Sequence, residues 1–214
     1  MSAAEILDEK EGRTSRKRRA IVGAATELFL RNGYLGTNMD QVADLARVSK
    51  QTVYKHFSSK KTLFIEIVTN ITNAGSDAVH SAAPRFIDGS DLAEYLLGYA
   101  CRQLEVVLTP RLMQLRRMVI GEVGRFPELG RSLYEAGPKR AMAAFAATLS
   151  DLASRDLLSI EDPKMAAAHF NWLIMAAPLN EAMLLGDEAL PSRTRLRRHA
   201  EQGVRVFLAA YRKK

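Results

Sequence analysis

One nine-residue segment, Ser49 to Phe57, brings together side chains that can bind a nucleic-acid duplex. Val53 and Phe57 lie four residues apart, so a helix would turn both of them toward a core. The opposite face would then present two ammonium groups, an amide and a phenol, which belong to Lys50, Lys55, Gln51 and Tyr54. An amide can pair with a base edge, whereas ammonium and phenol groups can hold phosphates. The segment predicts a DNA-binding surface helix, although a plain helical hairpin with a polar outer face would show the same spacing.

The residues before this segment predict the helices that would position it. Apolar residues at helical spacing indicate a first helix over about 14–32, which the Asn32-Gly33 pair should end. Thr37, with Asp40 three residues later, predicts the N-cap of a short second helix over about 38–46, and Ser49 predicts the next cap. A long helix followed by two short ones is the layout of a helix-turn-helix, whose second short helix can enter a major groove.

The positive charge is concentrated in the same part of the chain. Residues 13–61 hold 11 Lys and Arg against 3 acidic residues, a net charge of +8, whereas residues 62–214 hold 19 against 17. A basic segment followed by a nearly neutral, apolar one favours a head that binds a polyanion, on a body with a different role. A merely solvated basic surface would give the same count.

The remainder of the 214-residue chain predicts helices joined by short links, nine or ten in all, and therefore an all-α fold. One of these helices should be interrupted at Gly137-Pro138, because a proline has no N–H group to donate to the preceding turn. The most apolar stretch, 165–185, contains His169, Pro178 and Glu181, which argues against a membrane span. The single cysteine, Cys101, excludes an intramolecular disulfide. Nucleotide-binding, zinc-protease and hydrolase motifs are absent and the four histidines are scattered, so we expect no catalytic residue, metal site or cofactor.

The run Thr52-Val-Tyr-Lys-His-Phe-Ser-Ser-Lys-Lys61, together with Asn32-Gly33-Tyr34 and Thr37, resembles the N-terminal signature of the TetR family of transcriptional regulators. The resemblance covers roughly residues 14–65. Arg47 stands where the family usually has glycine, and Gln51 stands where a small residue is common. Because position 51 is often a base-contacting position in this family, Gln51 would affect which DNA sequence is read.

The resemblance implies a flexible leader over 1–13, a helix-turn-helix DNA-binding domain over 14–61, and an effector-binding and dimerisation domain over 62–214. It implies a cytoplasmic homodimeric repressor that leaves a palindromic double-stranded operator when a small-molecule effector binds, although an activator would look the same. Phosphate contacts are expected at both ends of the motif and base contacts at 50–52, with His56 open to a purely structural role. The implied DNA-binding residues are Thr37, Ser49, Lys50, Gln51, Thr52, Tyr54, Lys55, His56 and Lys60.

The body offers candidates for an effector pocket and a dimer interface, and ordinary core packing would explain both sets. The pocket candidates are Tyr95, Cys101, Met113, Met118, Phe145, His169 and Trp172. Two apolar stripes could form a four-helix interface, one of Phe170, Ile174 and Ala177, the other of Leu196, Ala200, Val204, Phe207 and Tyr211. Residues 126–186 loosely resemble the C-terminal domain of AefR-like regulators. The alternative is a helical enzyme or ligand carrier whose basic head binds a protein or a membrane.

Overall fold

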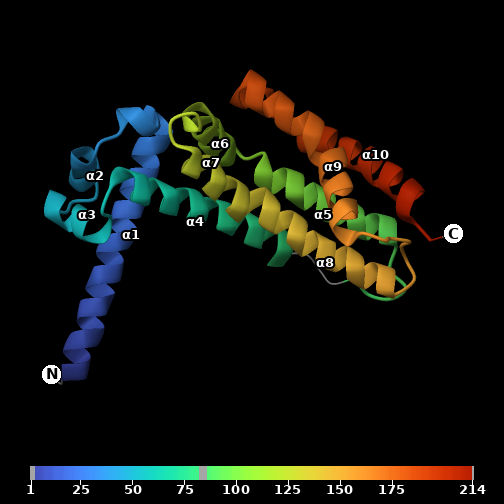
Figure 1. Cartoon of the computed structure of the whole chain (residues 1–214), viewed down its shortest axis with the longest axis horizontal. Helices are drawn as coiled ribbons and strands as arrows, with labels where there is room; N and C mark the ends of the chain where they lie inside the picture. Colours follow the sequence, from blue (N-terminus) through green and yellow to red (C-terminus); the bar gives the residue numbers. More distant parts are fainter. Residues whose placement is uncertain (1–2, 82–85, 214) are drawn as a thin grey trace. The chain divides into compact units, whose positions relative to one another are not determined.

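The computed structural model describes residues 3–81 and 86–213, and these ranges fold as helices and loops with one isolated bridge, between Leu158 and Arg212 (Figure 1). The all-α class is therefore confirmed. The chain divides into two compact units, Met1–Asn70 with Met118–Ser132, and Ile71–Arg117 with Leu133–Lys214. This division differs from the single boundary after residue 61 that the sequence suggested, because three helices, α4 (Lys60–Ser81), α6 (Pro110–Glu122) and α7 (Pro127–Tyr134), each contribute residues to both units.

The first unit is built on α1 (Ala3–Gly36), α2 (Met39–Leu45) and α3 (Lys50–His56), which Figure 1 shows in blue to cyan. Helix α1 begins at Ala3, so the segment expected to be a flexible leader is already helical from that residue. Gly33 has a left-handed backbone (φ 75°), which interrupts α1 where the sequence predicted its end. Beyond this kink, one further helical turn places Tyr34 in the core.

Four aromatic rings form the centre of the first unit. The ring centroids of Phe29 and Phe64 lie 4.8 Å apart, and Tyr34 lies 5.0 Å from both Phe64 and Phe126. These edge-to-face contacts join α1, α4 and the residue that precedes α7 (Pro127–Tyr134). A segment more than fifty residues further along the chain therefore belongs to the core of the helix-turn-helix unit.

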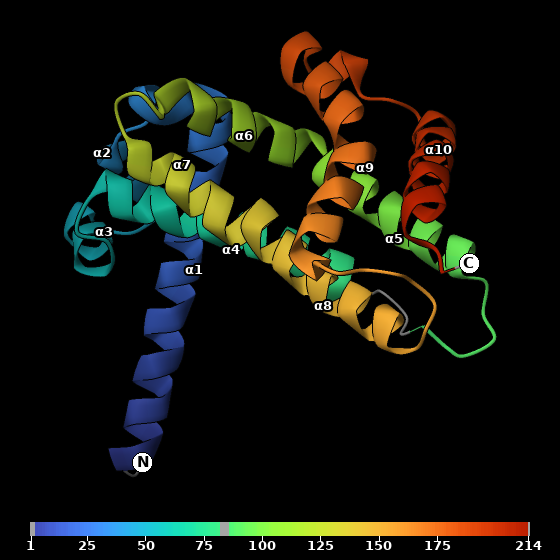
Figure 2. The same ribbon diagram turned by 45° about the vertical axis from the view of Figure 1, so that its right-hand side comes forward.

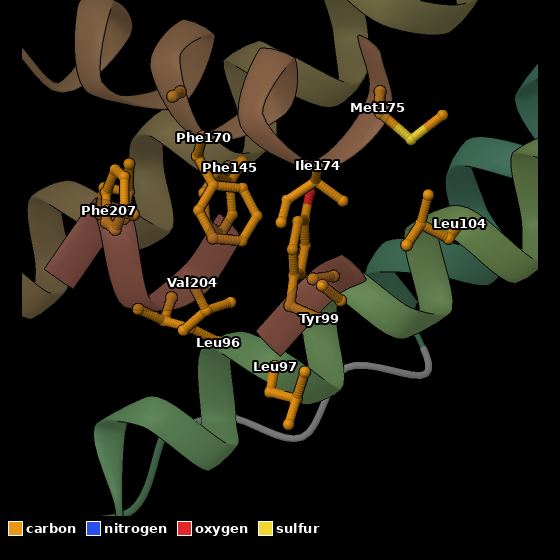
Figure 3. Packing of buried hydrophobic residues seen from close by; sticks show 14 of the residues in the cluster. Leu96, Leu97, Tyr99, Leu104, Phe145, Phe170, Ile174, Met175, Val204 and Phe207 are labelled. Carbon is orange, nitrogen blue, oxygen red and sulfur yellow. The ribbon is translucent and has the colours of Figure 1, made fainter. Parts of the chain in front are cut away.

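In the second unit, α9 (Pro163–Leu185) packs against α8 (Arg140–Ser154) and α10 (Arg193–Tyr211), and α10 packs against α5 (Leu92–Val107) (Figures 1 and 2). The core between these helices contains stacked and tilted aromatic rings. Phe145 lies 4.1 Å from Tyr99 and 4.6 Å from Phe170, and Phe207 meets Phe170 edge-on at 5.1 Å. Figure 3 shows these rings pointing toward one another. A short 3₁₀ turn, Asp187–Ala189, links α9 to α10.

Helix α7 continues into α8 through a π-helical turn, Glu135–Lys139, where the sequence predicted an interruption at Gly137-Pro138. That expectation was wrong because a π turn adds a residue to the helix and changes which backbone groups must pair, so a proline without an N–H group can be accommodated. Packing also favours glycine at position 137, because a Cβ there would lie 2.7 Å from Thr72 Cγ2 of α4. The π turn and α4 approach each other closely only because residue 137 lacks a side chain.

None of the helices in the described ranges combines the length and the apolar character that crossing a bilayer requires.

Candidate nucleic-acid interface and internal cavity

Helix α3 is held on the first unit by one apolar side and by its caps. Val53 is fully buried, and Phe57, which follows the helix, is buried as well. Ser49 is the N-cap, as the sequence predicted, and its hydroxyl accepts a hydrogen bond from the Thr52 backbone N–H at 3.1 Å. With these groups turned inward, the remaining side chains of α3 face away from the core.

The outward face of α3 carries Lys50, Gln51, Tyr54 and Lys55, all of them exposed. The exposure that the sequence predicted for this face is therefore confirmed. One of its cations already has a partner, because Lys50 Nζ lies 2.8 Å from Asp40 Oδ1 of α2. This hydrogen bond raises the pKa of Lys50. The ion pair couples the two short helices and competes with any phosphate or base for the ammonium group.

Thr37, Thr52 and His56 are less available than the sequence suggested. Thr37 is 1% exposed and donates its hydroxyl to the Gly33 carbonyl at 2.9 Å, so its side chain is not free to bind a phosphate. Asn38 is the N-cap of α2 instead, because its side chain accepts from the Asp40 and Gln41 N–H groups while Gln41 completes a capping box. The Thr52 hydroxyl lies 2.8 Å from the Ser49 hydroxyl, and His56 is half-buried with its ring 6.4 Å from that of Phe57.

Lys60 has a structural role that sequence reasoning missed. Its ammonium group donates to the Tyr34 carbonyl at 2.9 Å and the Thr37 carbonyl at 2.8 Å, and it lies 4.7 Å from the centre of the Tyr34 ring. Burial lowers the Lys60 pKa. The cation satisfies carbonyls at the C-terminal end of α1, where a helix dipole favours positive charge. This geometry differs from the expected phosphate contact, because backbone groups of the same chain use the donors.

Arg18 is likewise engaged within the first unit. Its guanidinium lies 5.1 Å from the centre of the Phe57 ring and forms an ion pair with Glu66 of α4. The basic side chains of α1 therefore include one that ties α1 to the end of α3 and to α4. The ion pair and the ring contact help to fix the orientation of α3.

The second unit contains a cavity of about 480 Å³, within the range that holds small organic ligands. Helices α4, α5, α6 and α9 and the α7–α8 rod contribute to it. Most of its lining is apolar, and the larger apolar side chains are Val79, Val106, Val107, Leu112, Leu133, Met142, Met175 and Leu179. Gly137, whose close approach to α4 is described above, also lines the cavity.

A few polar groups interrupt this apolar lining. Gln103 donates its amide N–H to Asn171 Oδ1 at 2.9 Å, which orients the Gln103 side chain. Gln103 Oε1 and Ser76 Oγ are buried and have no hydrogen-bond partner among the described residues. Arg116 lines the same cavity, and burial lowers its pKa. No acidic residue is part of the described lining.

Of the seven pocket candidates that the sequence suggested, Trp172 lines this cavity and the other six do not. Met113 and Phe145 are buried in the core and are not among the residues that line this cavity. Tyr95 packs edge-on against Phe86 at 5.3 Å. The three remaining candidates lie elsewhere. His169 lines a depression between α9 and α10, where its Nδ1 is 2.6 Å from the Tyr211 hydroxyl, Cys101 lines another depression, and Met118 belongs to the first unit. Gln103 and Arg116 were missed because a polar residue among apolar ones on a helix does not reveal whether it faces water or a cavity.

Most of the expected dimer residues cannot provide a free surface. Phe170, Ile174, Leu196, Ala200, Val204 and Phe207 are buried within the protomer. The stripes pack against each other and against α5 and α8, which was the alternative explanation for them. Of the remaining two, Ala177 is exposed and Tyr211 is half-buried. The exposed apolar side chains of α9 and α10 are a different set, which includes Met165, Trp172 and Val206.

Both the helix-turn-helix segment and the C-terminal helices match families of known proteins. Residues 21–67 match the model of the bacterial regulatory proteins of the tetR family, and residues 94–213 match that of the AefR-like transcriptional repressor C-terminal domain. The HTH-type transcriptional regulator RutR of Escherichia coli (strain K12) is 29% identical over 94 residues. That match covers 44% of this chain and 44% of RutR, so this chain spans less than half of that curated relative.

Solved structures match over nearly the full length. A structure described as a TetR-family transcriptional regulator from Mesorhizobium loti MAFF303099 is 38% identical, with a TM-score of 0.87, and the match covers 94% of this chain and 98% of that one. The flavonoid-responsive regulator FrrA is 29% identical with a TM-score of 0.77, covering 94% and 99%. The chain belongs to the TetR family of bacterial transcriptional regulators, which are DNA-binding proteins and not enzymes.

Proposed function

We propose that this protein is a homodimeric repressor that binds a palindromic operator through α3 and releases it when a small molecule occupies the cavity of the second unit. The observation that carries the DNA-binding part is the outward face of α3, where two cations, an amide and a phenol surround a helix anchored by Val53. These groups face solvent, so they can meet a duplex without rearrangement of the core.

The geometry sorts the proposed DNA contacts into two kinds. Gln51 and Lys50 lie in the first turn of α3, and the N-terminal residues of a recognition helix are the ones that contact base edges. Tyr54 and Lys55 lie one turn later and are suited to phosphates. Thr37 and Lys60 act through the fold, since the hydroxyl of one and the ammonium of the other are bound to backbone carbonyls.

The dimer is proposed to form on the exposed apolar side of α9 and α10. Met165, Trp172 and Val206 are each about half exposed, and a depression between the two helices is lined by Trp172, Val206 and Tyr211, among others. A two-fold interface uses the same patch on both subunits. It would present two copies of α3 to successive major grooves about 34–36 Å apart.

Effector release is proposed to act through α4 and α6. Ser76 of α4 and Arg116 of α6 line the cavity, and both helices also contribute residues to the first unit. A ligand that favours one position of these helices would lower operator affinity only if DNA favours the other. Because FrrA is described as flavonoid-responsive, flavonoids are the first class of compound to test.

The operator can be found by selecting bound duplexes from a random pool. We expect an inverted repeat whose half-sites lie about one helical turn apart. Gln51→Ala should select a different sequence, whereas Tyr54→Phe should weaken all duplexes similarly. Lys139→Ala, which truncates an exposed side chain of the π turn, is the control and should select the original repeat. Binding that does not distinguish any duplex from heparin would contradict the proposal and favour a ligand carrier.

The regulatory part needs a separate test on the selected operator. A cell-free transcription template that carries the repeat across its promoter should be silenced by the protein and reactivated by an effector that lowers operator affinity. Transcription that rises when the protein is added would identify an activator instead.

A further inference from the structure

Arg116 and Arg117 are neighbours on α6, yet their surroundings differ completely. The Arg117 guanidinium donates to the Ala182 carbonyl at 2.9 Å and forms an ion pair with Asp187. Arg116 is half-buried, lines the cavity, and has no ion pair or hydrogen bond among the described residues. Burial without a compensating anion disfavours a cation, which is the physical cause of its lowered pKa. Arg117 therefore stabilises the fold through its contacts. No contact within the described chain accounts for the half-buried charge of Arg116.

Two buried polar atoms share the cavity with Arg116 and also have no protein partner. Ser76 and Gln103 are each 6% exposed, and Ser76 Oγ and Gln103 Oε1 make no hydrogen bond within the described chain. Leaving such groups unpaired in an apolar interior is costly. Gln103 cannot simply turn toward solvent, because its N–H group is bound to Asn171.

The rest of the lining limits what can fill this space. Its apolar side chains suit a hydrocarbon or aromatic body, and its described members include no acid that would attract a cation. A guanidinium is well matched to a carboxylate or another oxygen acid, and such charge-assisted hydrogen bonds are the strong ones.

We propose that the cavity binds an amphipathic organic anion, with its acidic oxygens on Arg116, a hydroxyl or other polar group near Gln103 and Ser76, and its apolar body against Met142, Met175 and Leu179. This inference adds a ligand class to the proposed effector role. Only the biological purpose of the ligand rests on that role. The binding chemistry itself stands on the composition of the cavity.

The test compares three probes that share one apolar body: 6-phenylhexanoate, 6-phenylhexan-1-ol and 6-phenylhexylamine. Calorimetry measures binding to the full-length protein, and the fluorescence of Trp172, which lines the cavity and is the only tryptophan of the chain, is a second measurement. We expect the acid to bind at least about tenfold more tightly than the alcohol, and the amine to bind weakest.

Two arginine variants on the same helix isolate the charge. Arg116→Gln should abolish the preference for the acid while leaving alcohol binding within about twofold, and Arg116→Lys should keep part of the preference. Arg111→Gln removes the same charge from an exposed position of α6 and should change nothing. Equal binding of acid and alcohol, tighter binding of the amine, an unchanged preference in Arg116→Gln, or no binding of the acid at about 1 mM would overturn the inference.

Operator binding is measured separately, so that the two proposals can fail independently. If the acid binds through Arg116 but leaves operator affinity unchanged, the ligand class stands and the effector role fails. If only a neutral compound binds in the cavity and releases the operator, the effector role stands and the anion is wrong.

Discussion

The two units differ in where their unpaired polar groups lie. They are on the outer surface of the first unit and in the interior of the second. In the first unit, Gln51 and Tyr54 point outward from α3 into solvent. In the second, Ser76 and Gln103 point into a mainly apolar cavity. Water satisfies exposed groups at little cost, so exposed polarity alone says little about function, whereas enclosed polarity must be explained. For the first unit, the class of partner must therefore be inferred from its basic charge and its fold. For the second unit, it can be inferred from the unpaired groups in the cavity.

The largest effect should come from the aromatic cluster that supports α3. Phe64 is fully buried and contacts both Phe29 and Tyr34, so Phe64→Ala should cost about 3–5 kcal/mol of folding free energy. Leu35→Ala, at an exposed position of the same unit, should cost less than about 0.5 kcal/mol. Chemical denaturation measures both variants. A loss below 1 kcal/mol in Phe64→Ala would mean that the first unit does not depend on this cluster.

A smaller effect is expected where the cavity wall is tightest. Gly137→Ala would bring a methyl group to 2.7 Å from Thr72 Cγ2 and should cost about 1–3 kcal/mol through overpacking. Thr72→Ser removes Cγ2 but keeps the hydroxyl, so the double variant should recover most of that loss. Thermal unfolding of the two single variants and the double variant measures the coupling. Additive losses would show that this close approach does not limit the packing of the π turn against α4.

The Lys50–Asp40 ion pair provides a test of how the outward face of α3 contributes to DNA affinity. Asp40→Asn frees the Lys50 ammonium and should increase duplex affinity by about two- to fivefold, a modest gain because exposed ion pairs are weak. Asp44→Asn makes the same charge change on α2, at an acid that forms no ion pair with any residue in the described part of the chain. Titration of labelled operator compares the variants. Equal gains in both would mean that overall charge, and not release of Lys50, sets the affinity.

The smallest effect concerns the satisfied arginine, Arg117. Hydrogen bonds from Arg117 and Gln114 hold the pKa of Asp187 below its ordinary value of 3.8. Because the folded pKa is the lower one, this contribution is fully present above about pH 4 and is lost as the pH falls through the folded pKa. Since Asp187 is about one-third exposed, we expect less than about 1 kcal/mol. Asp187→Asn should flatten the stability curve of the wild-type protein below pH 4, and an unchanged curve would argue against this bond.

Local sequence signals predicted the helix-turn-helix well. Ser49 caps α3, Val53 anchors it, and Gly33 adopts the left-handed backbone expected at the end of the first helix. Each of these features depends on residues within one or two turns of the chain. The backbone contacts of Lys60 were not predicted, because its carbonyl partners lie 23 and 26 residues away, on an element whose position a local pattern does not specify.

The second unit shows the limits of periodicity. The stripes on α9 and α10 are apolar as predicted, but a stripe does not reveal whether its partner is the same chain or a second copy. Phe170 and Phe207 turned out to contact each other within one protomer. The cavity is still harder to predict from the sequence, because Ser76, Gln103 and Arg116 come from three different helices. Only their arrangement in space shows that they share a site.

The exposed face of α3 is tested most directly by the salt dependence of operator binding. If six to ten phosphates are contacted, affinity should fall by about 10³–10⁵-fold between 50 and 200 mM salt. Lys55→Gln should reduce the slope of log affinity against log salt by about one, whereas Lys139→Gln, at an exposed lysine of the π turn, should leave it unchanged. A salt-independent affinity, or equal slopes for wild type and Lys55→Gln, would show that another surface binds the DNA.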